Sequence, residues 1–163
     1  MEILNNEAER SKRFSRPLSV VLFDIDYFKH YNDTNGHQKG DALLTQIGKM
    51  LKELVREIDT LGRYGGEEFI IVLPEIQPHE AKYVSERIRK TIENYEFEYQ
   101  SSQPNGNITI SLGLITCMNG SLTPDEMIKL ADINLYKAKN KGRNCLVSSI
   151  VIDKNLGEVE NID

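Results

Sequence analysis

Two adjacent glycines, Gly65 and Gly66, lie between two apolar runs of strand length and constrain the fold more than any other feature of the chain. Tight two-residue turns need a positive φ angle, which glycine adopts without steric cost. The sequence therefore predicts a β-hairpin whose strands span residues 60–64 and 67–73.

Further strands alternate with helices along the chain. Apolar, strand-length runs predict strands at residues 18–24, 108–115 and 145–152. A cluster of turn-forming residues occupies 32–36, and a polar stretch at 97–107 is predicted to be a loop. Strands that alternate with long helices, together with one hairpin, predict an α/β (α+β) fold with a mixed central β-sheet flanked by helices.

The helices are predicted from apolar spacing and from capping residues. A helix over residues 2–15 has weak periodicity, whereas apolar steps of three and four residues predict a strong helix face that ends with Ile58. A second helix begins at Pro78 and is expected to bury Tyr95. Thr123 and Glu126 form a capping box for a third helix, which stops at Gly142.

Length and charge exclude several classes of protein. A chain of 163 residues predicts one domain, and no apolar run approaches the ~20 residues that span a bilayer. A net charge of −5 argues against a general nucleic-acid surface. Cys117 and Cys145 are too few for a disulfide framework and are expected to be small buried hydrophobes.

Two acidic clusters fall at strand ends, namely Asp24-Ile25-Asp26 and Glu67-Glu68. Carboxylates at such places are either solvated turn residues or ligands of a hard cation, since Mg²⁺ is held by one or two carboxylates plus substrate phosphates. The neighbouring glycine pair favours the second interpretation, because a phosphate can lie against a backbone without side chains.

Basic residues occur where a phosphate ligand would need them. Lys29 follows the first acidic cluster, and several cations crowd the end of the third helix: Lys137, Lys139, Lys141 and Arg143. Complementarity to the helix dipole explains this crowding as well as ligand binding does. Spacing alone leaves both explanations open.

Four motifs resemble those of one family, and they occur along the chain in the same order as in that family. The segment 63–69, which reads RYGGEEF, is similar to the signature hairpin of the GGDEF domain of diguanylate cyclases, in its GGEEF form. Residues 24–33 resemble the family's DxDxFKxxND segment, and residues 35–41 its NGHxxGD segment. Residues 131–144 resemble its ADxxLYxAK…GRN ending, so the likeness spans about residues 17–150.

The resemblance implies an enzyme that condenses two GTP molecules into cyclic di-GMP and releases two pyrophosphates. It implies a ferredoxin-like fold related to the polymerase palm and the nucleotide cyclases, with two Mg²⁺ or Mn²⁺ ions per active site. Each domain supplies half of a symmetric product, so a homodimer is expected for catalysis. The resemblance also implies a cytoplasmic domain, whose full-length parent could be tethered to a membrane.

The family's site residues carry over onto matching positions of this chain. The catalytic residues would be Asp24, Glu67 and Glu68, which with the carbonyl of Ile25 would also hold the metal. The remaining positions would bind substrate: Phe28, Lys29, Asn32, Asp41, Gly65, Gly66, Lys139 and Arg143. Asp41 and Asn32 could instead serve a helix N-terminus and an Asx turn, Phe28 could be a core residue, and Asp26 is expected to have a structural or supporting role.

An RxxD pattern, Arg56 to Asp59, resembles the family's inhibitory product site, and Arg87 matches its further arginine on the next helix. Arginine offers a planar fork that suits both phosphate and the guanine edge. The same spacing also describes an ordinary ion pair on a helix. Arg10 could be a further contact from a neighbouring chain.

One departure concerns the N-terminal side, where the family's DxLTxLxNR stretch is absent. This suggests an excised catalytic domain at residues 17–152, with 1–16 as the end of a connection to a missing sensor and 153–163 as an acidic tail that frays. The alternative function is a cyclic di-GMP receptor module that signals through the RxxD site. An enzyme that accepts ATP is a weaker alternative, which the retained Asp41 opposes.

Overall fold

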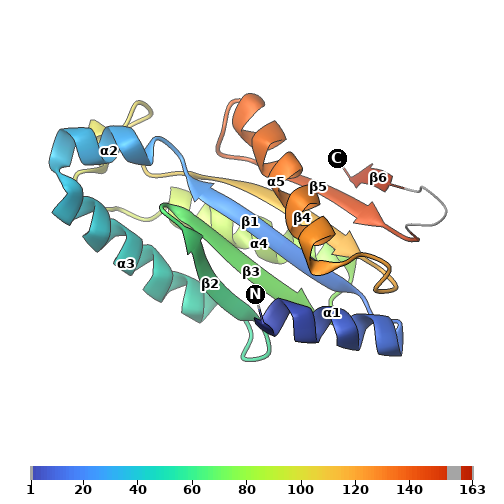
Figure 1. The fold of residues 1–163 in the computed structure, drawn as a ribbon. Coiled ribbons are helices and arrows are strands. Elements are labelled where there is room, and N and C mark those ends of the chain that lie inside the picture. Colours follow the sequence, from blue (N-terminus) through green and yellow to red (C-terminus); the bar gives the residue numbers. More distant parts are fainter. Residues whose placement is uncertain (1, 154–158, 163) are drawn as a thin grey trace.

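The computed structural model describes residues 2–153 and 159–162, and the side chains of 2–153. Helices and strands alternate through most of the chain (Figure 1). In chain order the elements are α1 (Glu2–Phe14), β1 (Leu18–Ile25), α2 (Phe28–Asn35), α3 (His37–Leu54), β2 (Thr60–Gly65), β3 (Glu68–Pro74), α4 (Pro78–Glu93), the 3₁₀ helix η1 (Gln100–Ser102), β4 (Ile110–Cys117), α5 (Pro124–Asn140), β5 (Leu146–Val151) and β6 (Val159–Ile162).

The strands form a single mixed sheet in the order β2-β3-β1-β4-β5-β6. Among the strands that the structure describes, only the β4–β5 pair is parallel, and α5 forms the crossover between these two strands. β1 lies between β3 and β4 and is antiparallel to both. The predicted mixed sheet flanked by helices is therefore confirmed, and β1 occupies the centre where both faces are covered.

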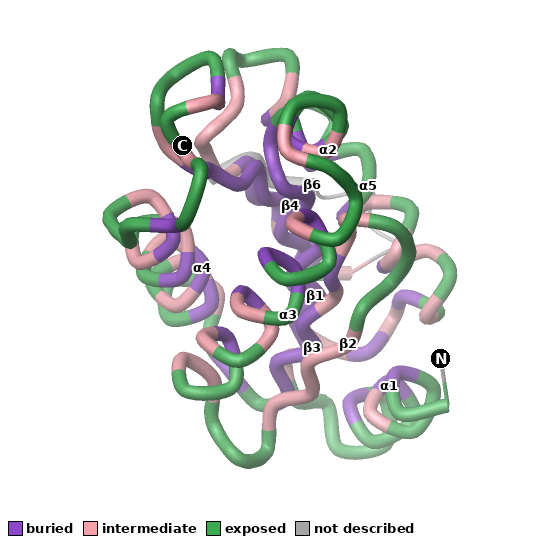
Figure 2. Tube along the Cα trace, turned by 90° about the vertical axis from the view of Figure 1, so that its left-hand side faces the viewer, coloured by how far each residue is buried: buried purple, intermediate pink, exposed green. Residues whose placement is uncertain are grey.

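Alternate residues of β1 enter two separate hydrophobic cores. Val21 and Phe23 pack with α2, α3 and α4 on one face, whereas Val20 and Leu22 pack with α1 and α5 on the other. All of β1 and β4 is buried, and Figure 2 shows this buried trace in purple between helices whose outer turns are green. A strand covered on both faces reads as a continuous apolar run, which is how β1 could be predicted.

α5 lies directly against the backbone of β4. A Cβ atom added at Gly113 would be 2.1 Å from the carbonyl oxygen of Ala131, so only glycine allows this approach. The predicted capping box is confirmed, because the Thr123 side chain accepts from the Glu126 backbone N–H and the Glu126 side chain reaches back to Thr123. The capping box therefore fixes where α5 begins, and Gly113 allows the short distance between α5 and β4.

Two predictions between β1 and β2 are wrong. Residues 32–35 were expected to turn, but they continue α2, because Phe28 and Tyr31 anchor that helix in the core and the chain turns only at Gly36. Ile58 was expected on a buried helix face, but α3 ends at Leu54 and Ile58 is 55% exposed. Local preference for turns was overridden by burial in the first case.

Three other elements differ in detail. η1 interrupts the stretch predicted to be a loop, and Tyr95 lies beyond the end of α4 and is 41% exposed. Within the segment predicted to fray, Val159–Ile162 forms β6 and pairs with β5. Every helix in the described part of the chain is too short or too polar to cross a bilayer.

Candidate active site

The two acidic clusters meet at one end of the sheet. Asp24 of β1 and Glu68 of β3 are direct partners in the antiparallel register. Residues opposite each other in such a pair have Cβ atoms about 5 Å apart. Asp24 is 8% exposed, whereas Glu67 and Glu68 are half-buried. The carboxylates predicted to act together are thus brought together by strand pairing.

A lysine from α5 completes this cluster. The Nζ atom of Lys139 lies 2.9 Å from Oδ2 of Asp24. Burial raises the pKa of Asp24 to about 6 although the hydrogen bond and charge of Lys139 lower it, and the charges of Glu67 and Glu68 raise it further. The site therefore concentrates negative charge around one buried carboxylate, which favours binding of cations.

The hairpin next to the acids has an open backbone. Glu68 pairs with Gly65, so the turn consists of Gly66 and Glu67, one residue later than the predicted Gly-Gly turn. A β-bulge between Arg63 and Gly65 shifts the register and accounts for the difference. Gly66 has φ +50°, and a Cβ atom at either glycine would meet no atom within 4 Å. A bulky anion can therefore approach this backbone.

Asn32 supplies a buried acceptor without a partner. Its Oδ1 atom is inaccessible to solvent and accepts no hydrogen bond within the described residues. Buried polar atoms are normally paired, so this unpaired oxygen is an exception within the fold. A Cβ atom at Gly40 would lie 1.8 Å from the same oxygen, so glycine is needed to leave room for Asn32. Asp41, next to Gly40 on α3, is exposed.

The other predicted substrate contacts take different positions. Phe28 is buried in the core beside Gly40, and Lys29 is exposed on the first turn of α2. The guanidinium of Arg143 lies over the ring of Tyr27, 4.6 Å from its centroid. The structure thus joins Asp24 to Lys139 by an ion pair and to Glu68 by strand pairing, while Asn32 lies on α2 and Arg143 on the connection after α5.

The residues of the RxxD pattern lie elsewhere, beside the start of α4. Arg56 donates to Oδ1 of Asp59 over 2.7 Å, and this pair raises the pKa of Arg56. Arg56 also donates to the Pro74 carbonyl, and Arg87 donates to the Leu54 carbonyl over 2.6 Å. Both arginines are thereby held near the end of α3.

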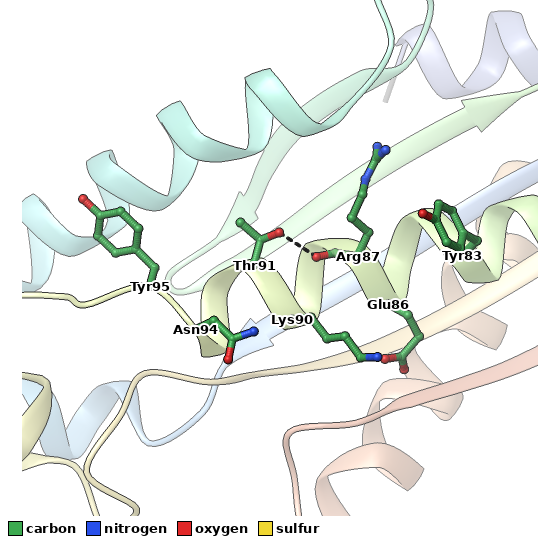
Figure 3. A pocket seen from close by; sticks show the side chains of 7 residues that line it. All are labelled: Tyr83, Glu86, Arg87, Lys90, Thr91, Asn94 and Tyr95. Carbon is green, nitrogen blue, oxygen red and sulfur yellow. Dashed lines mark hydrogen bonds between the residues drawn. The ribbon is translucent and has the colours of Figure 1, made fainter.

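Two surface cavities adjoin these arginines. One of about 570 Å³ is lined by Arg87 and other α4 side chains, together with Asn94 and Tyr95 just after the helix (Figure 3). Another of about 460 Å³ is lined by residues that include Arg56, and Tyr83 borders both cavities. Arg10, which could be a further contact for a neighbouring chain, pairs with Glu7 and Glu75 of its own chain.

A family model described as diguanylate cyclase, GGDEF domain, matches residues 1–145 of the sequence. The chain belongs to the GGDEF family. This membership confirms the resemblance carried by the four motifs.

Relatives of this GGDEF domain agree with that assignment. The response regulator PleD of Caulobacter vibrioides is 38% identical over 144 residues, which cover 88% of this chain and 32% of PleD. The chain therefore spans about a third of the length of this curated relative.

Two solved structures share the fold. The active GGEEF domain of a diguanylate cyclase from Vibrio cholerae is 33% identical with a TM-score of 0.82, covering 90% of this chain and 92% of that one. The GGDEF domain of DgcB from Caulobacter crescentus, solved in complex with c-di-GMP, is 26% identical with a TM-score of 0.82, covering 90% and 86%.

Two site features of this GGDEF domain were missed by the sequence prediction, although one of them has a signal in the sequence. Gly40 makes room for Asn32, and the signal for it is a glycine inside an otherwise helical segment. Tyr27 lies under Arg143 although the two are far apart in the sequence, and no local pattern marks that contact.

Proposed function

We propose that this GGDEF domain condenses two GTP molecules into cyclic di-GMP and releases two pyrophosphates. Each domain of a homodimer would hold one GTP, and the two sites would meet face to face. The observation that carries the proposal is the cross-strand pair of Asp24 and Glu68, beside Lys139 and an open glycine turn. Because GTP is the substrate, we place the activity in the cytoplasm.

The donor atoms fit Mg²⁺ or Mn²⁺, which bind oxygen ligands. Asp24, Glu67 and Glu68 would hold the ions with the carbonyl of Ile25. Burial raises the pKa of Asp24, and the nearby charges of Glu67 and Glu68 raise it further, so a cation there would relieve the clustering of negative charge. In the described part of the chain no group of three acids, cysteines or histidines is assembled to complete a metal shell, so Asp24, Glu67 and Glu68 do not complete one by themselves. Substrate phosphates therefore have to complete it, as is usual for magnesium. When bound, such ions offset phosphate charge and lower the pKa of a hydroxyl.

Basic side chains would orient the triphosphate. Lys139 already lies within hydrogen-bonding distance of Asp24, so it can bridge from the carboxylate to a phosphate oxygen. Lys29 and Arg143 would bind further phosphate oxygens, and the open backbone at Gly65 and Gly66 leaves room for the phosphates. Holding the α-phosphorus in line with the attacking oxygen is the main contribution a protein makes to such a transfer.

Guanine would be recognised at the end of α2. The unpaired Oδ1 of Asn32 and the carboxylate of Asp41 are both acceptors, and the guanine edge presents an N1–H and an amine as donors. Adenine does not offer the same pair of donors. A ligand that leaves the buried Asn32 oxygen unpaired forfeits about 1–3 kcal/mol, so discrimination against ATP follows.

The bond-making step transfers a nucleotidyl group. The 3′-hydroxyl oxygen of one GTP forms a bond to the α-phosphorus of the other, while the bond from that phosphorus to pyrophosphate breaks. Glu67 or Glu68 would take up the hydroxyl proton, and the reciprocal attack closes the ring and releases the second pyrophosphate. The product would then bind at Arg56, Asp59 and Arg87 and inhibit turnover, a role supported by the cavities beside these residues.

The test is turnover of GTP with Mg²⁺ by the parent, by Glu68→Gln and by Glu53→Gln, a matched change on the exposed side of α3. We expect cyclic di-GMP from the parent and the control, and a loss of about 100-fold or more in Glu68→Gln. Turnover should rise faster than linearly with protein concentration, because two domains must meet. Nucleotide binding without product from any of the three supports the receptor module instead.

A further inference from the structure

The connection between α5 and β5 has an unusual backbone. Arg143 and Asn144 have φ angles of +67° and +47°, and they follow Gly142 at +111°. Left-handed conformations are uncommon for residues with a side chain and cost free energy unless the surroundings hold them. Arg143 is itself a proposed phosphate contact. Two consecutive left-handed residues at this position indicate a turn whose conformation is maintained by its surroundings.

A buried carboxylate holds this turn from the β1 side. Oδ2 of Asp26 accepts from the backbone N–H of Asn144 over 3.0 Å and from Thr109 over 2.7 Å, while Oδ1 accepts from Ser111 over 2.7 Å. Asp26 is 3% exposed. Its oxygens are therefore occupied within the protein, and its position sets that of the turn.

The side chain of Asn144 fastens the same turn to α4. Its Oδ1 accepts from Nη1 of Arg89 over 2.7 Å, and its Nδ2 donates to Oε1 of Glu93 over 2.6 Å. Hydrogen bonds to charged groups are the stronger ones in proteins. Arg143 thus projects from a backbone that is fixed on both sides.

Tyr27, the residue after Asp26, supports Arg143 directly. Its ring lies 4.6 Å from the guanidinium carbon, and it also has a left-handed φ angle, +57°. Two consecutive residues after β1 therefore hold two consecutive residues after α5. Tyr27 is 37% exposed, so its ring lies at the surface of the site rather than in the core.

We propose that Tyr27 is a positioning residue that holds the guanidinium of Arg143 in the orientation needed to bind the triphosphate. A ring that covers one face of the guanidinium restricts its rotation but leaves its N–H edge free, and that edge binds phosphate oxygens. Tyr27 acts through Arg143 and need not touch the nucleotide itself. This inference rests on the proposed function, because it takes Arg143 to be a phosphate contact.

The test is a double-mutant cycle that measures the Kd of a non-hydrolysable GTP analogue with Mg²⁺. We expect Tyr27→Leu to weaken binding about two- to fivefold, as loss of an exposed cation–π contact would. Tyr27→Phe keeps the ring and should bind like the parent. In an Arg143→Ala background, Tyr27→Leu should have no further effect, whereas a general structural role would give the same loss in both backgrounds.

The outcomes separate the two proposals. Because Tyr27 is partly exposed, thermal unfolding should give similar midpoints for all variants and so exclude misfolding as the cause. If the parent binds the analogue but Tyr27→Leu binds it equally well, or loses as much in the Arg143→Ala background, the inference is wrong and the proposed function stands. If the parent binds no analogue, the proposed function fails and the inference fails with it.

Discussion

Replacing Asp24 by asparagine is expected to stabilise the domain without ligand while abolishing turnover. Burial, with Glu67 and Glu68, raises the pKa of Asp24 from its ordinary value of 3.8 to about 6, despite Lys139. Between these two values the folded chain binds more protons than the unfolded chain, so stability falls as the pH rises. Below 3.8 the group is protonated in both states, and above about 6 the destabilisation is fully present.

The magnitude follows from the size of the shift. A difference of about two pKa units corresponds to about 3 kcal/mol if the group were shielded completely. Because water reaches Glu67 and Glu68 at the open side of the cluster, we expect about half of this, about 1–2 kcal/mol, after screening. For a domain of this size that gain corresponds to a midpoint of thermal unfolding higher by about 3–6 °C.

Thermal unfolding in the presence of a chelator, at pH 8 and at pH 5, measures this effect. Asp24→Asn should exceed the parent in stability at pH 8, and the difference should shrink at pH 5, where the parent carboxyl is largely protonated. Asp132→Asn, on the exposed side of α5, is the matched control and should change little. An Asp24→Asn variant less stable than the parent at pH 8 would refute the electrostatic reasoning.

Three further substitutions test the site and the fold. In Gly40→Ala the new Cβ would lie 1.8 Å from Oδ1 of Asn32 and 3.1 Å from the buried ring of Phe28, so Asn32 has to move and we expect the KM for GTP to rise about tenfold. A lower unfolding midpoint with an unchanged KM would contradict this. Arg56→Ala should raise the inhibition constant for cyclic di-GMP about tenfold or more and leave the uninhibited kcat unchanged, as measured by initial rates with added product; equal inhibition would remove Arg56 from the product site. In Gly113→Ala the new Cβ would lie 2.1 Å from the backbone oxygen of Ala131, which cannot turn away, so urea denaturation should show a loss of about 1–3 kcal/mol, and an unchanged midpoint would argue against close contact of α5 with β4.

The parts of the site that sequence could predict are those determined by neighbouring residues. Asp24 ends an apolar strand and Glu68 follows a glycine turn, so both could be placed at strand ends before the sheet was known. The helix α2 could not, because its asparagines and aspartate favour turns locally and only the burial of Phe28 and Tyr31 makes the segment helical. Local preference and tertiary packing disagree there, and packing decides.

Contacts between distant segments were also beyond prediction. Asp26 and Asn144 are 118 residues apart, and nothing in either segment indicates that a carboxylate of one will hold the backbone of the other. The exact turn of the hairpin was missed for a related reason, since the bulge after Arg63 depends on pairing with β3. Such features depend on how whole elements are placed against each other.

The two sides of α4 have separate roles, so substitutions in this helix can alter one proposed site without the other. Arg87 reaches the end of α3, while Arg89, two positions along, holds Asn144 next to the proposed phosphate contact. Residues two apart on a helix point in different directions. A genetic screen for feedback-resistant variants that still produce cyclic di-GMP should therefore recover α4 substitutions on the Arg87 side of the helix and few on the Arg89 side.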